Sequence, residues 1–130
     1  MPQFTLNEAD ITGHVFGPNN PKRGDLRLIV ERRLLDPTTG QKVGTITSVL
    51  TYMEVISRDD VFVLGIAEHH LNDNVKPPAR EGVISVQGSF RFLQTDDPVF
   101  SIVGGTGGYR NARGTVTLGE DKFTYDVDYT

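Results

Sequence analysis

The sequence predicts an all-β protein, more specifically an eight-stranded antiparallel closed β-barrel with a hydrophobic cavity. Strand-like patterns run through the 130 residues, short polar turns separate them, and no window holds a sustained helical period. Many short strands of this kind form a sandwich or a barrel. Closure removes exposed strand edges, and a barrel of about eight strands has room for side chains or one small ligand. We expect a single barrel domain over residues 1–130.

The first half of the chain contains four strand-like segments. Residues 3–7 alternate apolar and polar side chains, and residues 26–35 form a long run of apolar and charged ones. A turn over residues 37–40 contains Pro and Gly at turn-forming positions. Residues 43–56 follow it and are rich in Thr, Val, Ile and Tyr, which favour strands. After a polar turn, residues 61–70 are predicted to form the fourth strand.

The second half begins with the longest irregular stretch and then returns to strands. Residues 72–82 include two adjacent prolines, which exclude a helix and predict a surface loop. Residues 83–93 alternate almost without a break, and residues 99–103 and 114–118 are two shorter strand-like segments. Residues 123–129 have the clearest period of two. On one face of that last segment we expect Phe123, Tyr125, Val127 and Tyr129.

Composition limits the function classes. The net charge of −4 opposes binding to phosphate backbones, so we expect no nucleic-acid partner. There is no Cys, which excludes disulfides, thiolate metal sites and a Cys nucleophile. Apolar stretches are far shorter than a membrane span. The first residues show no basic segment followed by an apolar run, so we expect a soluble cytoplasmic protein.

A glycine-rich segment over residues 103–114 resembles a nucleotide-binding loop at first sight. A dinucleotide fingerprint needs a helix after the glycines, but residues 114–118 predict another strand. The Gly-Lys-Ser/Thr of a phosphate-binding loop is also missing. We therefore interpret the segment as a tight connection that needs positive φ at several glycines, with Tyr109 packed over it.

The same segment, Phe100-Ser101-Ile102-Val103-Gly104-Gly105-Thr106-Gly107-Gly108-Tyr109-Arg110-Asn111-Ala112-Arg113-Gly114, resembles the signature of the allene oxide cyclase and dirigent-protein barrel superfamily. Gly82-Val83-Ile84-Ser85-Val86-Gln87-Gly88 resembles its central strand. The resemblance implies an eight-stranded barrel with a hydrophobic cavity, acting on reactive apolar intermediates as a dimer or trimer. Asn7 matches a family Asn, whereas Thr5 replaces an acidic residue and Leu50 replaces a pocket Cys.

Strand alternation gives the expected pocket residues. If Leu50 points inward, Ser48, Tyr52 and Glu54 also point inward. If Phe62 points inward, the residues on the same face of its strand are Leu64, Ile66, Glu68 and His70. Glu68 and His70 would share a face about 7 Å apart, as an acid–base pair. We expect the catalytic residues to be Asn7, Tyr52, Glu68 and His70. The expected substrate-binding residues are Thr5, Leu50, Glu54, Phe62, Leu64, Ile66, Phe90, Phe92 and Tyr125.

We expect no metal, because His69 and His70 are neighbours on a strand and point to opposite faces. The leading hypothesis is a cofactor-free cyclase or isomerase of specialised-metabolite biosynthesis, which folds a reactive apolar small molecule and controls its ring closure. The alternative is a non-catalytic, lipocalin-like carrier of a hydrophobic molecule. A third interpretation is a structural scaffold whose barrel is filled by its own side chains. In each case we expect a homo-oligomer.

Overall fold

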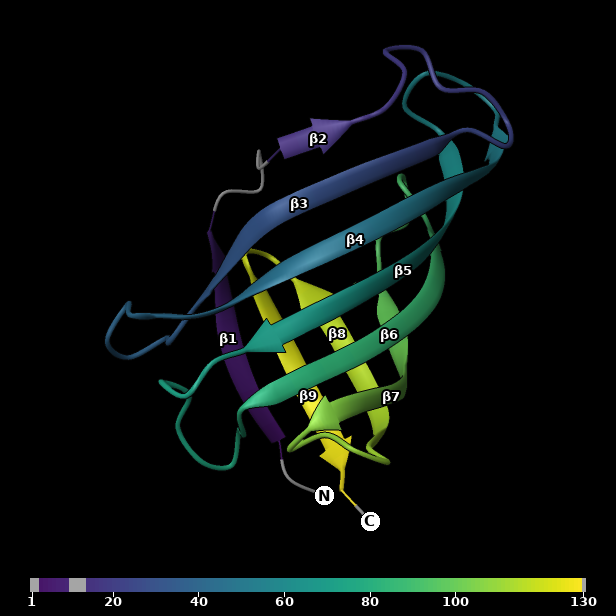
Figure 1. Ribbon diagram of the computed structural model, residues 1–130. Helices are drawn as coiled ribbons and strands as arrows, with labels where there is room; N and C mark the ends of the chain where they lie inside the picture. The colour runs from purple at the N-terminus through teal and green to yellow at the C-terminus, as the bar shows by residue number, and fades with distance from the viewer. Residues whose placement is uncertain (1–2, 10–13, 130) are drawn as a thin grey trace.

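The computed structural model describes residues 3–9 and 14–129, and its regular structure in these ranges consists of strands alone. The strands, shown in Figure 1, are β1 (Gln3–Ala9), β2 (His14–Phe16), β3 (Leu26–Leu35), β4 (Lys42–Val55), β5 (Val61–Leu71), β6 (Gly82–Arg91), β7 (Val99–Gly107), β8 (Arg113–Gly119) and β9 (Lys122–Asp128). All neighbours pair antiparallel, in the order β1-β9-β8-β7-β6-β5-β4-β3-β2. An additional pairing of β1 with β3 closes the barrel.

The strand that the sequence did not predict is β2. Its three residues pair with Leu28 to Val30 of β3, whereas β1 pairs with Arg33 to Leu35 farther along β3. The two short strands thus share one edge of β3, and eight longer strands form the barrel wall. The predicted eight-stranded antiparallel barrel is confirmed. No helix in the described part of the chain is long and apolar enough to span a membrane.

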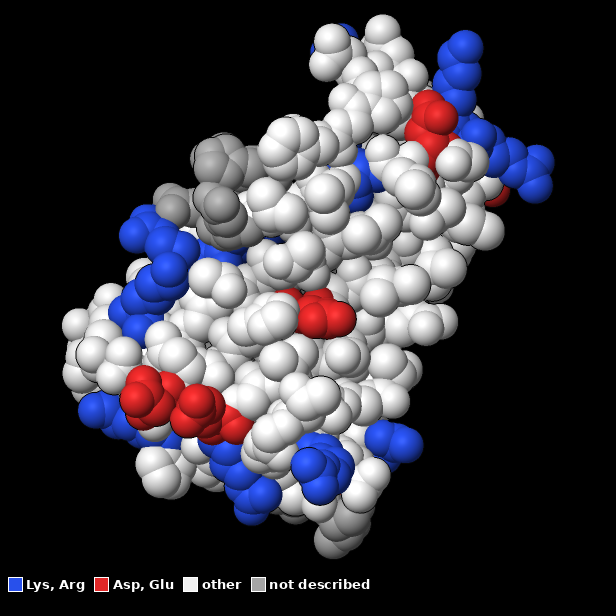
Figure 2. All heavy atoms as spheres, viewed as in Figure 1, with Lys and Arg blue, Asp and Glu red and all other residues white. Residues whose placement is uncertain are grey.

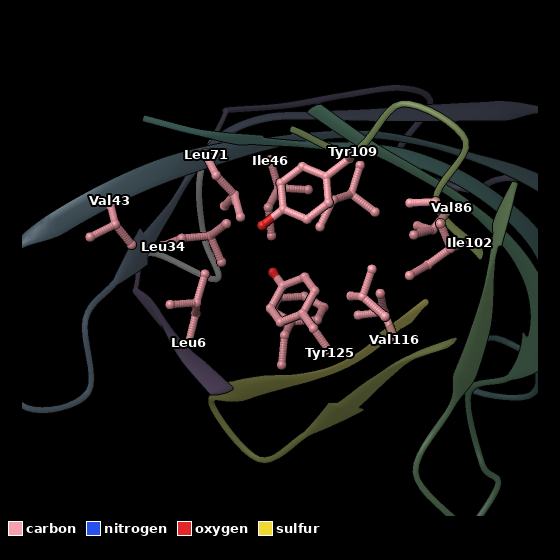
Figure 3. Close-up of a cluster of buried hydrophobic side chains, with 14 residues drawn as sticks. Leu6, Leu34, Val43, Ile46, Leu71, Val86, Ile102, Tyr109, Val116 and Tyr125 are labelled. Atoms are coloured by element: carbon pink, nitrogen blue, oxygen red, sulfur yellow. The ribbon is translucent and has the colours of Figure 1, made fainter. Parts of the chain in front are cut away.

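The core fills one part of the barrel interior. Fourteen buried side chains form it, including Leu34, Ile84, Tyr109, Val116 and Tyr125, each 0% exposed. Figure 3 shows the rings of Tyr109 and Tyr125 facing each other near the centre, with their hydroxyl groups toward one another. Aliphatic side chains from opposite walls surround them. This part of the interior is therefore packed by the protein itself.

The glycine-rich segment is the end of β7 and a tight turn. Gly107 has a φ of +64°, a conformation that glycine adopts without steric strain. A Cβ on Gly105 would lie 2.3 Å from the Val83 oxygen and 2.8 Å from the Tyr109 Cβ. Tyr109 is fully buried, and its hydroxyl accepts a hydrogen bond from the Arg80 amide at 2.8 Å. The segment thus serves close packing, as its interpretation as a tight connection requires.

Candidate functional site

The barrel interior contains a partly open cavity of about 180 Å³ beside the packed core. It lies where the wall carries small inward residues, namely Ser48 on β4 and Gly65 and Ala67 on β5. Most of the remaining lining is aliphatic or aromatic, including Phe90 and Phe100. For scale, an engineered apolar cavity of about 150 Å³ binds benzene. The cavity therefore has room for one ring with a few substituent atoms.

Strand register places the polar lining groups near one another. Arg32, Ile46 and His69 lie side by side on β3, β4 and β5 and face the interior. The next inward position on β4 is Ser48, which pairs with Ala67. Ser48 is thus diagonal to His69, at a separation of about 7–8 Å typical of diagonal neighbours on a sheet. Three polar side chains therefore line one region of an otherwise apolar cavity.

His69 is the most buried of the polar lining residues, at 2% exposure. Its Nδ1 lies 2.8 Å from the Tyr125 hydroxyl. Its ring makes T-shaped contacts with the rings of Phe123 and Tyr125, with centroid distances of 5.0 and 5.5 Å. Burial, reinforced by the positive charge of Arg32 and by the neighbouring His70, lowers the pKa of His69 to about 3. The imidazole is therefore neutral throughout the physiological range.

The neighbours of His69 determine which tautomer it adopts. Burial raises the pKa of Tyr125 well above its ordinary value, so its hydroxyl keeps its proton. Among the described residues, the sole acceptor for this proton is His69 Nδ1. A buried hydroxyl without an acceptor is unfavourable, so we assign Tyr125 as the donor and Nδ1 as the acceptor. The imidazole proton is then on Nε2, which hydrogen-bonds to no side chain or main chain of the described ranges.

An ion pair adjoins this histidine. Arg32 donates from Nε and Nη2 to one carboxylate oxygen of Glu8, at 2.9 and 2.5 Å, and the Glu8 side chain is 2% exposed. The Arg32 guanidinium also lies over the Phe123 ring, 5.8 Å from its centroid. Because Glu8 balances Arg32 and His69 is neutral, the polar side of the cavity carries no net charge.

Ser48 supplies a further polar atom. The residue is 5% exposed, and its Oγ is buried without a hydrogen-bond partner among the described residues. Buried hydroxyl groups nearly always have a partner. Ser48 is one of the residues that line the cavity.

Two openings flank the cavity region. Phe90 and Leu118 line the cavity and also an open groove of about 530 Å³ formed with the turn after β6 and the turn after β8. A second hollow of about 320 Å³ lies at the same end of β4 and β5, where Tyr52 contacts Arg27 and Phe92. Phe90 and Leu118 are thus shared by the cavity and the open groove.

The structure places four expected site residues inside the barrel. Leu50 and Phe90 line the cavity, and Tyr125 is hydrogen-bonded to His69. Tyr52 is buried, at 2% exposure, and lines the second hollow. Phe92 is 41% exposed, where it packs against Tyr52 and Phe90. Leu50 and Phe90 therefore lie at the cavity, whereas Tyr52 and Phe92 lie at the second hollow.

The prediction for β5 is wrong: the residues expected to point into the barrel lie on its outer face. Phe62 and Ile66 are 40% and 52% exposed, Leu64 is half-buried, and the side chains of Glu68 and His70 are 55% and 48% exposed. Glu68 and His70 do contact each other, 3.3 Å apart, but outside the barrel. Ile66 borders the cavity between two small residues, so its main chain forms that part of the wall. The inward set is instead Val61, Val63, Gly65, Ala67, His69 and Leu71.

In β1, too, the side chains that point inward are one position along the chain from those expected. Leu6 and Glu8 are buried at 5% and 8% exposure, so Thr5 and Asn7 lie on the opposite face and are half-buried there. On β4, a register shift between Tyr52 and Glu54 interrupts the alternation, and Glu54 is exposed. The polar groups that reach the interior are therefore neighbours of those expected, one position along the chain.

Sequence reasoning missed Glu8, Arg32 and His69 as site residues. The small residues Ala67 and Gly65, two and four positions before His69, are a usable signal, since small inward side chains leave space in a barrel. The described residues hold no group of three or more His, Asp or Glu side chains arranged to bind a metal ion.

No protein-family model matches this chain, and no curated protein matches it significantly. Its fold is nevertheless found among solved structures. Pyocyanin demethylase superimposes with a TM-score of 0.72 at 19% identity, over 97% of this chain and 99% of that chain. Two pterocarpan synthase dirigent proteins have TM-scores of 0.67 and 0.69 at 16% identity, over 96% of this chain and 81% and 91% of theirs.

These similarities establish a shared barrel fold over almost the whole chain. They support the dirigent side of the resemblance at the level of the fold. None of the three is an allene oxide cyclase, so the cyclase side of that resemblance has no support from them.

Proposed function

We propose that the protein is a cofactor-free isomerase or cyclase that acts on a small, largely apolar molecule inside the barrel. The observation that carries this proposal is the neutral His69 imidazole, held by Tyr125 and lining an otherwise apolar cavity. The names of the structural neighbours, a pyocyanin demethylase and pterocarpan synthases, fit a barrel that acts on small organic molecules.

The proposed chemistry uses His69 as an electrophile. Its Nε2–H donates a hydrogen bond to a substrate oxygen on which negative charge develops while a bond shifts or a ring closes. A neutral imidazole with a strongly lowered pKa is known to polarise a carbonyl in this way. A preoriented donor is worth most in a site that excludes water. An isomerisation conserves the atoms and electrons of the substrate, so the proposal requires no co-reactant.

The test compares wild type with two variants against a panel of uncharged ring compounds that carry a carbonyl, epoxide or phenol group. Isomerisation is detected as a product of unchanged mass and changed chromatographic retention. His69→Leu removes the Nε2–H donor and is expected to lower turnover at least about a hundredfold, as removal of an oxyanion donor does. Ala67→Leu is expected to fill the cavity and abolish binding. Turnover unaffected by both variants would refute this site.

The second candidate is a carrier that binds a hydrophobic molecule without changing it. The predominantly apolar lining favours it. In the same assay a carrier releases its ligand with mass and retention unchanged, and Ala67→Leu abolishes binding whereas His69→Leu leaves the ligand's chemical form unaffected. The two candidates thus differ in whether the chromatographic retention of the ligand changes.

We also propose that the protein forms a homo-oligomer through the outer face of β4 and β5. Met53, Phe62 and Ile66 are 44%, 40% and 52% exposed on these strands. Figure 2 shows the face over β3 to β6 as largely uncharged, with an acidic group near its centre and most other charged groups toward its edges. Exposed apolar surface of this kind marks association sites. Ile66→Asp is expected to convert the oligomer to a monomer in light-scattering measurements, and a monomeric wild type would refute the proposal.

A further inference from the structure

The hydroxyl of Ser48 identifies the kind of ligand that the cavity takes. The hydroxyl oxygen is buried and unpartnered among the described residues, and Ser48 is one of the residues that line the cavity. A buried hydroxyl left without a hydrogen bond is destabilising, so a residue kept at such a position in a cavity needs a partner there. Replacement of Ser48 by an apolar residue would remove this penalty in a protein whose barrel bound nothing polar.

His69 carries a second donor, and this residue also lines the cavity. Its Nδ1 is engaged by Tyr125, which leaves Nε2–H as the group without a partner in the described ranges. Ser48 and His69 occupy diagonal positions on adjacent strands, close enough for one ligand atom to lie between their polar atoms. One oxygen atom can accept hydrogen bonds from both of these donors.

The charge balance of the site restricts that oxygen further. The facing charged and titratable groups are Glu8 on β1, Arg32 on β3, His69 on β5 and Tyr125 on β9. Arg32 is already neutralised by Glu8, and the other two are uncharged. The rest of the lining has no titratable side chain. An ionised ligand would therefore be an uncompensated charge in an apolar enclosure, which is strongly unfavourable.

We propose that Ser48 and His69 together bind the oxygen of a compact, uncharged ring compound, such as a phenol or a ring ketone, held in the apolar part of the cavity. This inference rests on the proposed role of the cavity as a small-molecule site. The cavity volume of about 180 Å³ matches one substituted ring and excludes a long acyl chain from lying wholly inside.

The test uses phenol and toluene, which have nearly the same size and differ in their polar atom. Dissociation constants are measured by calorimetry for wild type, Ser48→Ala, and the control Ser101→Ala on the exposed outer face of β7. Ser48→Ala is expected to weaken phenol binding about three- to tenfold relative to toluene binding, the usual value of one neutral hydrogen bond. Ser101→Ala should change neither. An unchanged phenol-to-toluene ratio in Ser48→Ala would overturn the inference, because Ser48 would then not contact the ligand.

A measurement on wild type alone tests the requirement for an uncharged ligand. 4-Nitrophenol absorbs differently in its neutral and ionised forms, so its spectrum reports which form is bound. The neutral form is expected in the complex, and affinity should fall about tenfold for each pH unit above the pKa of the free phenol. A bound phenolate spectrum would overturn the inference, because Arg32 would then be attracting an anion.

The outcomes separate this inference from the proposed function. If wild type binds neither phenol nor toluene, the cavity is not a ligand site and both fail. If phenol binds with the expected dependence on Ser48 but no ring compound is isomerised, the ligand class stands and the catalytic proposal fails.

Discussion

Protonation of His69 offers the sharpest test of the interior that we describe. In an unfolded chain a histidine has its ordinary pKa of 6.5, whereas burial in the barrel lowers the pKa of His69 to about 3. Below pH 6.5 the unfolded chain therefore binds a proton that the folded chain does not bind. The free energy of unfolding must fall as the pH falls from 6.5 toward 3, and this histidine has no effect above pH 6.5.

The size of the effect follows from the two pKa values. Each pH unit between them contributes about 1.4 kcal/mol, so at pH 4.5 the loss is about 2.7 kcal/mol. A typical small domain has a total stability of about 5–15 kcal/mol, so this one side chain would account for a large share of the acid sensitivity. The other resolved shifts act elsewhere. Backbone hydrogen bonds from Thr39 and Thr38 lower the pKa of Asp36, and Arg91 lowers that of Asp60, so both carboxyls act below pH 3.8.

The assay is urea unfolding followed by far-ultraviolet circular dichroism at several pH values between 7.5 and 4.5. His69→Gln keeps an acceptor for Tyr125 but cannot titrate. Between pH 7.5 and 4.5 its free energy of unfolding is therefore expected to fall by about 2–3 kcal/mol less than that of wild type. His70→Gln, on the outer face, is the matched control and should retain most of the wild-type dependence, because burial is the main cause of the lowered pKa of His69. If wild type and His69→Gln lose the same stability between pH 6.5 and 4.5, His69 is not buried as a neutral group and our assignment of the site is wrong.

Two further predictions concern the ion pair and the glycine-rich segment. Glu8→Gln should lower the free energy of unfolding by about 3–5 kcal/mol in urea titrations, because it leaves Arg32 buried without its partner, and Glu8→Gln combined with Arg32→Met should recover much of this loss. If the double variant loses as much free energy of unfolding as the two single variants lose together, this explanation is wrong. Gly105→Ala should cost at least about 2 kcal/mol because its Cβ would overlap the Val83 oxygen, whereas a Cβ on Gly104 meets no atom within 4 Å. Equal melting temperatures for Gly105→Ala and Gly104→Ala would show that the backbone packing is looser than described.

Much of the fold follows from sequence alone. The period of two over residues 123–129 and the dense β-branched composition of residues 43–56 are local properties, and both segments are strands in the structure. The inward set of β9, with Phe123, Tyr125 and Val127, was predictable because its other face is clearly polar. Where one face of a strand is polar, alternation by itself specifies which side chains are buried.

The candidate site depended on tertiary structure because β5 is apolar on both faces. Phe62, Leu64 and Ile66 form one plausible inward set, and Val61, Val63 and Ala67 form the other. A shift of one residue exchanges the two faces of a strand, so the choice between these sets also decides whether His69 or its neighbours reach the interior. The pairing of β5 with β4 and β6 makes that choice, and it does so through contacts remote in sequence.

The cavity chemistry was decided in the same way. Glu8 and Arg32 form an ion pair across 24 positions of the chain, and His69 meets Tyr125 across 56. No local pattern encodes either contact, because each depends on barrel closure and on strand register. The sequence by itself thus determined that this chain forms strands with an apolar barrel interior. Register and closure, which follow from packing the whole chain, decided which polar groups that interior encloses.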